Sequence, residues 1–267
     1  MRALLAAHGE APLQPGGEDT AEPYLCHLVH HHRALVTVEA GRVVAFGAAV
    51  DTGRCRMLSD LFVRPDRLGQ GIGRTLLAAL LGDGERLATF SSADPRALPS
   101  YVRAGMTPRW VNLYLQGLPQ RLPDPGPAVT VRSAVPAELA ALESRWLGAP
   151  RTADHAFWAT LPGADPFLVE DRGRPVAFGY GRARSSSPAR ALDRLVVAPA
   201  VDPVAPSVAG LIRAGRGSGV QLCVPGPHPL LPVLLEAGFR IVDQDQFLAS
   251  HPDIVDPAHL LPNPGLL

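Results

Sequence analysis

Residues 61–81 read LFVRPDRLGQGIGRTLLAALL, and the order of elements in this stretch is the most informative feature of the chain. An apolar run at residues 57–63 is typical of a strand, Pro65 ends it, and a glycine-rich loop and an apolar-periodic helix follow. Glycine carries no Cβ, so the loop backbone can approach a ligand closely. The first N–H groups of a helix lack helical acceptors, and its dipole favours negative charge there. A strand, a glycine-rich turn and a helix N-terminus together predict a pyrophosphate-binding site.

The glycine spacing argues against the two common nucleotide-binding loops. A P-loop ends in Gly-Lys-Ser/Thr, and this loop has no such ending. Gly69, Gly71 and Gly73 do not have the Gly-x-Gly-x-x-Gly spacing of dinucleotide-binding proteins. We therefore expect a pyrophosphate ligand of another kind.

The loop resembles the acyl-CoA loop of the GNAT superfamily of N-acyltransferases, in which Arg/Gln-x-x-Gly-x-Gly/Ala follows a strand ending in Val-x-Pro. Residues 63–65 (VRP) and 71–73 (GIG) match this pattern, whereas Leu68 replaces the leading Arg or Gln. The resemblance implies that acetyl-CoA is the cosubstrate and that backbone amides hold its phosphates. The residues that we expect at the cofactor are Leu61, Phe62, Val63, Leu68, Gly69, Gln70, Gly71, Ile72, Gly73 and Arg74. Arg74 either touches phosphate or is an exposed helix arginine.

A second motif follows at a suitable distance. Residues 95–104 predict a short helix, with Gly105 as a left-handed cap and Met106 opening a strand. Residues 101–106 (YVRAGM) resemble the family's Tyr-x-x-x-Gly-Phe motif, whose tyrosine protonates the departing CoA thiolate. The resemblance implies that Tyr101 is a catalytic acid. The alternative is an aromatic side chain packed at the end of a helix.

Acyl transfer to an amine also needs a base, because an alkyl amine has a pKa near 10 and must lose a proton to attack. Asp60, near the end of the predicted strand, is the candidate; Glu39 and Asp51 flank the preceding hairpin. Asp60 could instead be a strand-edge carboxylate in solvent, and Glu39 a turn residue.

An internal repeat organises the chain. Residues 43–47 (VVAFG) recur at 175–179 (PVAFG), 61–65 (LFVRP) at 195–199 (LVVAP), and 104–106 (AGM) at 237–239 (AGF), with offsets of 132, 134 and 133 residues. Equal spacing of three separate elements indicates two copies of one fold. The resemblance then implies an α/β (α+β) fold class: two tandem GNAT folds, each a mixed, mainly antiparallel central sheet flanked by helices.

A segment rich in proline and glycine separates the copies. It cannot continue a helix or a central strand, so it is a linker. We expect a GNAT domain at residues 1–118, a linker at 119–127, a degenerate GNAT-like domain at 128–250 and a proline-rich tail at 251–267. Each copy should contain a hairpin, a strand, the loop, a helix, a strand, a helix and a closing strand pair.

The second copy has lost its chemical features. Pro203 and Pro206, which stand in the loop, have no N–H for a phosphate, and Asp202 would repel one. Leu234 occupies the position of the motif tyrosine. The first copy is therefore expected to be the active one.

Composition restricts the partners. Hydrophobic residues make up 46% of the 267 residues and the formal net charge is 0, so the chain can bury a core and lacks the basic surface of nucleic-acid-binding proteins. No apolar run reaches the roughly 18 residues that a membrane span needs. The N-terminus becomes polar too soon for a secretion signal. Three scattered cysteines without metal spacing suit a reducing cytoplasm. We expect a cytoplasmic protein with no membrane partner.

Three further features leave alternatives open. Among His27, His30, His31 and His32, positions i, i+3 and i+4 share a helical face. No carboxylate or cysteine pattern completes a site, so we expect no metal; a polar helix end or a proton relay is the alternative. Four arginines near residues 185–187 suggest a solvated hairpin loop, with an anion site as the alternative; they are Arg182, Arg184, Arg190 and Arg194. The apolar end of the tail should pack over a groove or against a neighbouring protomer, as in a homodimer.

The leading hypothesis is an acetyl-CoA-dependent N-acetyltransferase acting on a small amine or amino-acid-like acceptor. A non-catalytic CoA-binding or interaction module is the rival hypothesis. An acyl group longer than acetyl is a third possibility, and it depends on the space beside Phe62.

Overall fold

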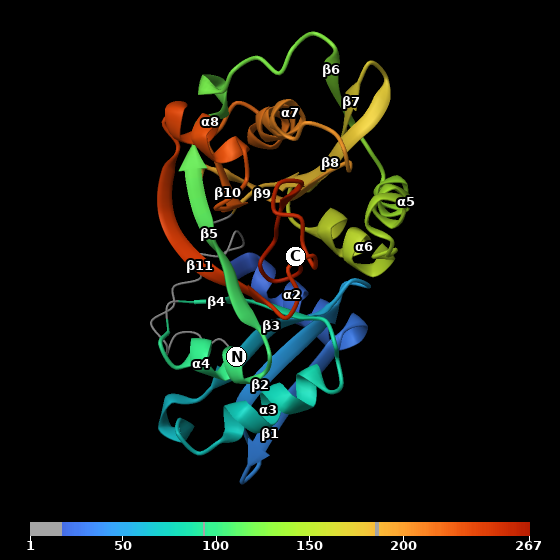
Figure 1. Cartoon of the computed structure of the whole chain (residues 1–267). Helices are drawn as coiled ribbons and strands as arrows, with labels where there is room; N and C mark the ends of the chain where they lie inside the picture. The colour runs from blue at the N-terminus through green and yellow to red at the C-terminus, as the bar shows by residue number, and fades with distance from the viewer. Residues whose placement is uncertain (1–17, 93, 185–186) are drawn as a thin grey trace.

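The computed structural model describes residues 18–267 apart from 93 and 185–186, and Figure 1 shows the two halves of the chain stacked one above the other. Residues 1–17, where no secretion signal is expected, and part of the loop at 185–187 lie outside the described residues. The first half contains α2 (Glu18–His31), β1 (Arg33–Glu39), β2 (Arg42–Asp51), β3 (Arg56–Val63), α3 (Ile72–Leu81), β4 (Leu87–Ser91), α4 (Ala97–Arg103) and β5 (Thr107–Gly117). The second half contains β6 (Val129–Ser133), α5 (Pro136–Leu147), α6 (Thr152–Thr160), β7 (Asp165–Asp171), β8 (Arg174–Arg182), β9 (Arg190–Val197), α7 (Val204–Gly215), β10 (Val220–Pro225), α8 (Leu230–Glu236), β11 (Arg240–Ala249) and β12 (Leu260–Leu261).

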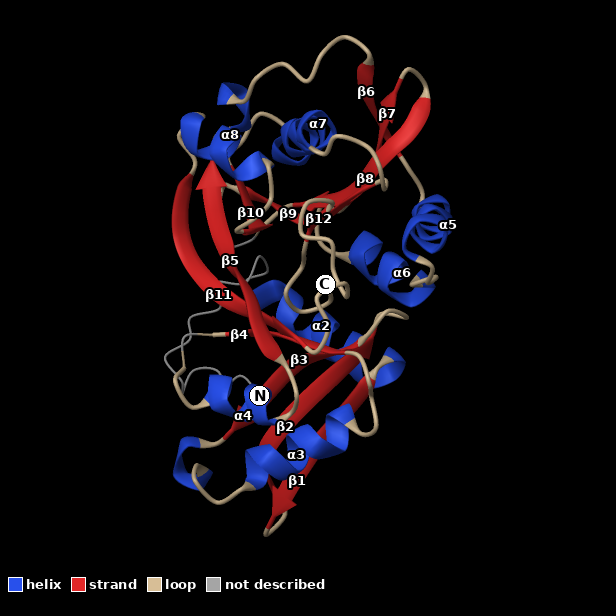
Figure 2. Cartoon of the chain, in the orientation of Figure 1, coloured by secondary structure: helices blue, strands red, loops and turns tan. Residues whose placement is uncertain are grey.

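Twelve strands form one sheet in the described part of the chain. Their order is β1-β2-β3-β4-β11-β5-β10-β9-β8-β7-β6, and β12 pairs with β9. Only the β3–β4 and β9–β10 pairs among these described strands are parallel. Helices flank the sheet (Figure 2). The mixed, mainly antiparallel α/β architecture predicted from the sequence is confirmed.

The internal repeat appears as matching local geometry. Both halves carry a hairpin whose two turn residues have positive φ, 47° and 74° at residues 40–41 and 49° and 74° at residues 172–173. Such angles belong to the type I′ turn, whose twist suits a two-residue hairpin. The next strand of each half carries one bulged residue, Ser59 in β3 and Asp193 in β9. Two copies of one fold are therefore present.

Each half contributes one long strand near its end to the other half's sheet. β11, from the second half, pairs with β4, and β5, from the first half, pairs with β10. β5 and β11 pair with each other along their whole length and join the halves, as the two long central strands in Figure 1 show. The expectation of a closing strand pair within each copy is therefore wrong. Sequence periodicity identifies strands but does not report which partner each one takes.

Alternation along β2 separates two cores. Phe46, Ala48 and Val50 belong to a cluster that also contains residues of α2, α5, α6 and the tail, whereas Ala45 and Ala49 belong to the cluster under α3. Successive strand side chains point to opposite faces, so α2 and α3 lie on opposite sides of the first sheet. The shared cluster, on the α2 side, lies between the two halves.

The C-terminal tail (residues 251–267) fills this junction. Ile254, Leu260, Leu266 and Leu267 are buried in the shared cluster, and Figure 1 shows the C-terminus between the halves. The apolar tail thus packs over a groove of its own chain. No helix among the described residues has the length and apolarity needed to cross a bilayer.

Candidate active site

The glycine loop (residues 68–73) connects β3 to α3 with two left-handed residues. Gly69 has φ of 79° and Gly71 has φ of 82°, and a Cβ on Gly69 would meet no atom within 4 Å. Gly73 has a different role, because a Cβ there would lie 3.3 Å from Cγ2 of Val63. The first two glycines shape an open loop, and the third lets the start of α3 pack closely on β3.

The N-terminus of α3 carries no capping side chain. Gly71 is the N-cap and makes no side-chain hydrogen bond, and the first turn has no acidic residue. The exposed residues of the loop are Leu68, Gly69 and Gln70, with Gly71–Gly73 partly buried behind them, and Arg74 in the first turn of α3 is exposed as well. A helix start of this kind offers N–H groups and a positive dipole end to an anion.

In the second half, the carboxylate of Asp202 lies at the start of α7, the helix that corresponds to α3. Asp202 Oδ1 accepts a hydrogen bond of 3.0 Å from the N–H of Val204, the first residue of α7. Asp202 directly precedes Pro203, the N-cap of α7, so its carboxylate lies beside the positive end of the helix dipole. An anion at the start of α7 would meet this negative charge.

The strands before the two loops also differ. The pairing of β3 with β4 ends at Leu58 and Thr89, while β3 stays paired with β2 to its end. In the second half the pairing of β9 with β10 likewise covers only the start of β9, and β12 lies on the remaining edge. The Val197 N–H donates to the carbonyl of His259 at 2.9 Å. The tail therefore fills, in the second half, the edge that corresponds to Leu61–Val63 in the first.

Tyr101 lies on α4 and is 7% exposed. It packs in the cluster under α3, together with Val63, Leu76 and Leu77. The side chain thus lies in the same cluster as the end of β3 and the first half of α3. Both the packing role and the catalytic role considered above agree with this position.

Asp60 is buried rather than solvated, which corrects the alternative of a strand-edge carboxylate in solvent. It is 7% exposed, and its Oδ2 accepts hydrogen bonds from the Tyr24 hydroxyl at 2.7 Å and the Ser59 hydroxyl at 2.9 Å. Burial raises the pKa of Asp60, against the lowering effect of these two hydrogen bonds. The Ser59 hydroxyl also lies 2.7 Å from the carbonyl of Gly265, so the tail closes over this group. A carboxyl group with a raised pKa is better suited to accept a proton near neutral pH.

The other candidate bases have local structural roles. Glu39 accepts a hydrogen bond of 2.8 Å from Nε of Arg67 at the end of the first hairpin. Asp51 accepts one of 2.9 Å from the Gly53 N–H and shapes the turn after β2. Asp51 is exposed and Glu39 is partly exposed.

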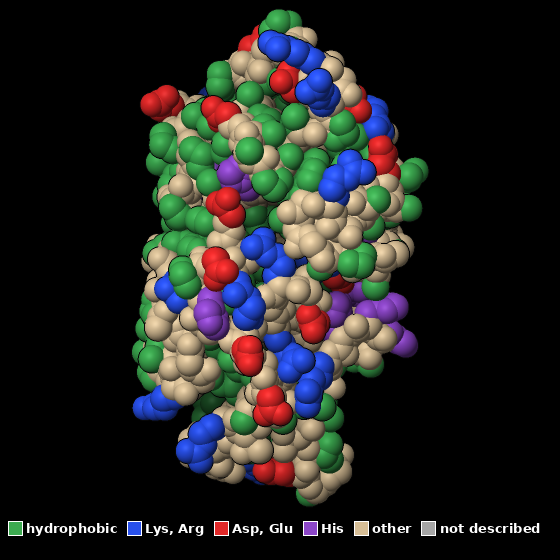
Figure 3. All heavy atoms as spheres, turned by 45° about the vertical axis from the view of Figure 1, so that its right-hand side comes forward, with side chains coloured by type: hydrophobic (Ala, Val, Ile, Leu, Met, Phe, Trp, Pro, Cys, Tyr) green, Lys and Arg blue, Asp and Glu red, His purple; other side chains and the backbone are tan. Residues whose placement is uncertain are grey.

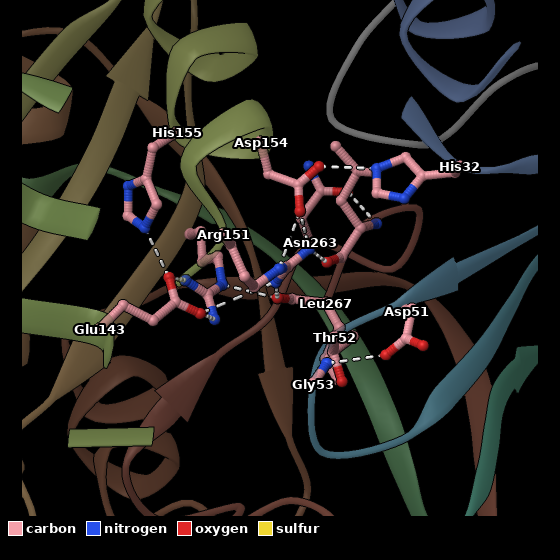
Figure 4. Close-up of polar contacts among 12 residues, drawn as sticks. His32, Asp51, Thr52, Gly53, Glu143, Arg151, Asp154, His155, Asn263 and Leu267 are labelled. Carbon is pink, nitrogen blue, oxygen red and sulfur yellow. Dashed lines mark hydrogen bonds and ion pairs between the residues drawn. The ribbon is translucent and has the colours of Figure 1, made fainter. Parts of the chain in front are cut away.

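Buried polar side chains of the second half and the tail form a network that sequence reasoning missed (Figure 4). Arg194 makes a bidentate contact with Glu143 at 2.7 and 2.8 Å, and His155 lies 2.7 Å from the same carboxylate. Burial alone would raise the pKa of Glu143, but Arg194 and His155 outweigh it and lower the pKa to about 2. Arg151 donates to the Leu267 carbonyl at 2.9 Å and to Asp154 at 2.8 Å.

The arginines near residues 185–187 are not all on a solvated loop. Arg182 and Arg194 are each 2% exposed and lie on β8 and β9. Arg182 pairs with Asp193 at 2.6 Å. The expectation of a solvated hairpin loop is wrong for Arg182 and Arg194, because their side chains point into the fold toward the carboxylates of Asp193 and Glu143.

Comparison with known proteins agrees with the fold. Residues 3–106 match the sequence model of the Acetyltransferase (GNAT) family. A putative acetyltransferase from Pyrococcus horikoshii superposes with a TM-score of 0.67 at 13% identity, covering 96% of this chain and 85% of its own. The tandem GNAT protein from the clavulanic acid biosynthesis pathway gives 0.58 at 17% identity, covering 92% of both chains. A GCN5-related N-acetyltransferase from Sphaerobacter thermophilus gives 0.56 at 17% identity, covering 92% of this chain and 90% of its own. Comparison with curated proteins gives no match.

The chain is a tandem GNAT-fold protein, with two copies of the fold joined in one sheet. Its first half matches the GNAT acetyltransferase family, whose general activity is acyl transfer.

Proposed function

We propose that the protein is an N-acetyltransferase that moves an acetyl group from acetyl-CoA to a primary amine of a small-molecule or amino-acid-like acceptor. One observation supports this most strongly: the two halves share a fold but differ at the cofactor position. The first half has left-handed glycines and no carboxylate at the start of α3, whereas in the second half Asp202 accepts a hydrogen bond from the first N–H of α7 and β12 lies on β9.

The second half also suggests how the cofactor lies in the first. β12 runs beside β9 as an extra strand, with a backbone hydrogen bond to Val197. By the repeat, Val197 corresponds to Val63. In this proposal the pantetheine arm of acetyl-CoA lies along Leu61–Val63 as β12 lies along β9, and its pyrophosphate meets the N–H groups of the glycine loop and α3. Arg74, exposed on the first turn of α3, adds a positive charge beside the phosphates.

The reaction needs one bond made and one broken. The neutral amine attacks the thioester carbonyl, a tetrahedral intermediate forms, and the carbon–sulfur bond breaks. The amine proton passes to Asp60, reached through its hydrogen-bond partners Tyr24 and Ser59, because Asp60 itself is buried. Tyr101 donates a proton to the departing thiolate. The neutral net charge of the chain favours a small amine over a strongly basic protein tail or a polyanion.

The direct test is release of free CoA thiol from acetyl-CoA with a panel of primary amines. We expect turnover with at least one small amine and a decrease in kcat of about 100-fold in Tyr101→Phe, because a general acid contributes that order of rate. Phenylalanine keeps the packing under α3, so the melting temperature of this variant should change little. Cofactor binding without turnover of any amine, and without an effect of Tyr101→Phe, would indicate the non-catalytic CoA-binding module instead.

A further inference from the structure

Three side chains from the two halves converge on one point. His27 lies on α2, His32 directly follows α2, and Asp154 lies on α6 of the second half. Oδ1 of Asp154 is 2.7 Å from Nε2 of His27 and 2.8 Å from Nε2 of His32, and the two Nε2 atoms are 3.2 Å apart. The three side chains are 3–7% exposed. Figure 3 shows histidines gathered at the level where the halves meet.

These distances suit a metal ion. Zinc bonds to imidazole nitrogen and carboxylate oxygen at about 2.0–2.2 Å, and the donor atoms of a tetrahedral site then lie about 3.3 Å apart. The three donor atoms here are slightly closer together, so a point within bonding distance of all three exists beside their plane. Binding would require the side chains to move apart by only a few tenths of an ångström.

The surroundings match those of metal ligands. Arg151 donates to the other oxygen of Asp154 at 2.8 Å, as outer-shell groups commonly do for a coordinating carboxylate. The ring of His27 stacks on Phe157 with centroids 4.4 Å apart, which fixes its orientation. If only hydrogen bonds held these side chains, the Nε2–H groups of His27 and His32 would both have to point at Oδ1 of Asp154, with the two nitrogens 3.2 Å apart. A cation accepts three lone pairs at that point without this conflict.

We propose that His27, His32 and Asp154 form a binding site for a divalent transition-metal ion of the zinc type, which braces α2 of the first half against α6 of the second. The sequence expectation of no metal rested on the lack of a carboxylate near the histidines. Asp154 lies 127 residues after His27, and only the fold brings it there. The same helix α2 carries Tyr24, which contacts Asp60, so the ion also holds the helix beside the proposed base.

The test is zinc and cobalt binding to the full-length protein after treatment with EDTA. We expect about one zinc per chain, a cobalt adduct with the visible absorption of a four-coordinate N/O site, and a higher melting temperature with metal, since an ion that binds only the folded state stabilises it. His32→Gln should weaken binding by at least about 100-fold, because it removes a direct ligand. Its circular dichroism and melting temperature in EDTA establish that it folds.

The matched control is the double variant His30→Gln, His31→Gln, which removes two exposed histidines from the same helix. This variant should bind zinc as the wild type does. Binding that is lost in the double variant and kept in His32→Gln would assign the metal to surface histidines and overturn the proposal. Lack of zinc and cobalt binding by the wild type would also overturn it and leave the three residues as a hydrogen-bonded contact.

Discussion

Asp60 is the residue at which the first half and the C-terminal tail meet the proposed chemistry. Its partners Tyr24 and Ser59 hold Oδ2, and Ser59 in turn contacts Gly265. Its place in the strand next to the cofactor loop could be predicted from the sequence. Its burial could not, because Gly265 lies 206 residues after Ser59 and no local pattern reports such a contact.

Asp60→Asn should lower activity and leave the fold intact. The pKa of Asp60 is higher in the folded protein than in the unfolded chain, so folding favours the protonated form. The destabilisation from the charged form therefore grows as pH rises from the usual carboxyl range through the folded pKa. Asparagine has no such charge and its side-chain oxygen can accept the same hydrogen bonds. We expect equal or higher stability above that range, a fall in kcat/KM of about 100-fold, and loss of the acid limb of the pH–rate profile.

Urea unfolding and initial rates from pH 5 to 9 measure both effects. Unchanged kcat/KM across this range would remove Asp60 from the proposed mechanism.

Local elements follow their sequence signals closely. α5 covers Pro136–Leu147, because Pro136 fits the first turn and Gly148, with φ of 81°, ends the helix. The hairpin and the helix expected after the glycine loop are also present, as β1–β2 and α3. Strand exchange was not predictable, because each exchanged strand pairs with a strand of the other half. The Arg194–Glu143 ion pair was not predictable either, because its partners lie 51 residues apart in the sequence.

Glu143 and Glu138 on α5 provide a matched pair of ion-pair variants. Glu143 is 1% exposed between Arg194 and His155, whereas Glu138 pairs with Arg132 at the surface. Glu143→Ala should cost about 3–5 kcal/mol of unfolding free energy, because it leaves a buried guanidinium without its carboxylate. Glu138→Ala should cost less than about 1 kcal/mol. Denaturant titration of both variants at pH 7 measures the difference, and equal losses would contradict the account.

The contribution of Glu143 to the free energy of unfolding depends on pH in a defined direction. The pKa of Glu143 is lowered to about 2 in the fold. Its contribution is therefore fully present above the ordinary carboxyl range and decreases as pH falls toward 2. The stability gap between the wild type and Glu143→Ala should narrow over this range.

At the scale of the whole molecule, the two copies form one folding unit. Each half contributes a strand to the other, and one cluster containing α2, α5, α6 and the tail lies between them. The number of copies could be predicted from the equal offsets of three motifs. The proposed boundaries at 118 and 128 divide the sequence into copies, but the pairings of β4 with β11 and of β5 with β10 connect strands on either side of this division.

Separation of the copies should therefore abolish folding. In a fragment of residues 1–127, β4 and β5 would lose their pairing with β11. In a fragment of residues 128–267, β10 and β11 would lose their pairing with β5. We expect both fragments to lack cooperative thermal transitions, and the full chain to unfold in one transition. Circular dichroism and calorimetry provide the measurement. Two separate transitions, or a folded fragment 1–127, would show that the halves are independent.

The central claim is that the chain holds one acetyl-CoA, at the glycine loop of the first half. Calorimetric titration with acetyl-CoA of the wild type, Gly71→Glu and Gly173→Glu tests it most directly. Both glycines have positive φ, 82° and 74°, so the two substitutions impose similar backbone strain, but residue 173 lies in a hairpin turn of the second half. We predict one equivalent bound by the wild type and by Gly173→Glu, and loss of binding in Gly71→Glu. Two equivalents, no binding by the wild type, or unchanged binding by Gly71→Glu would contradict the claim.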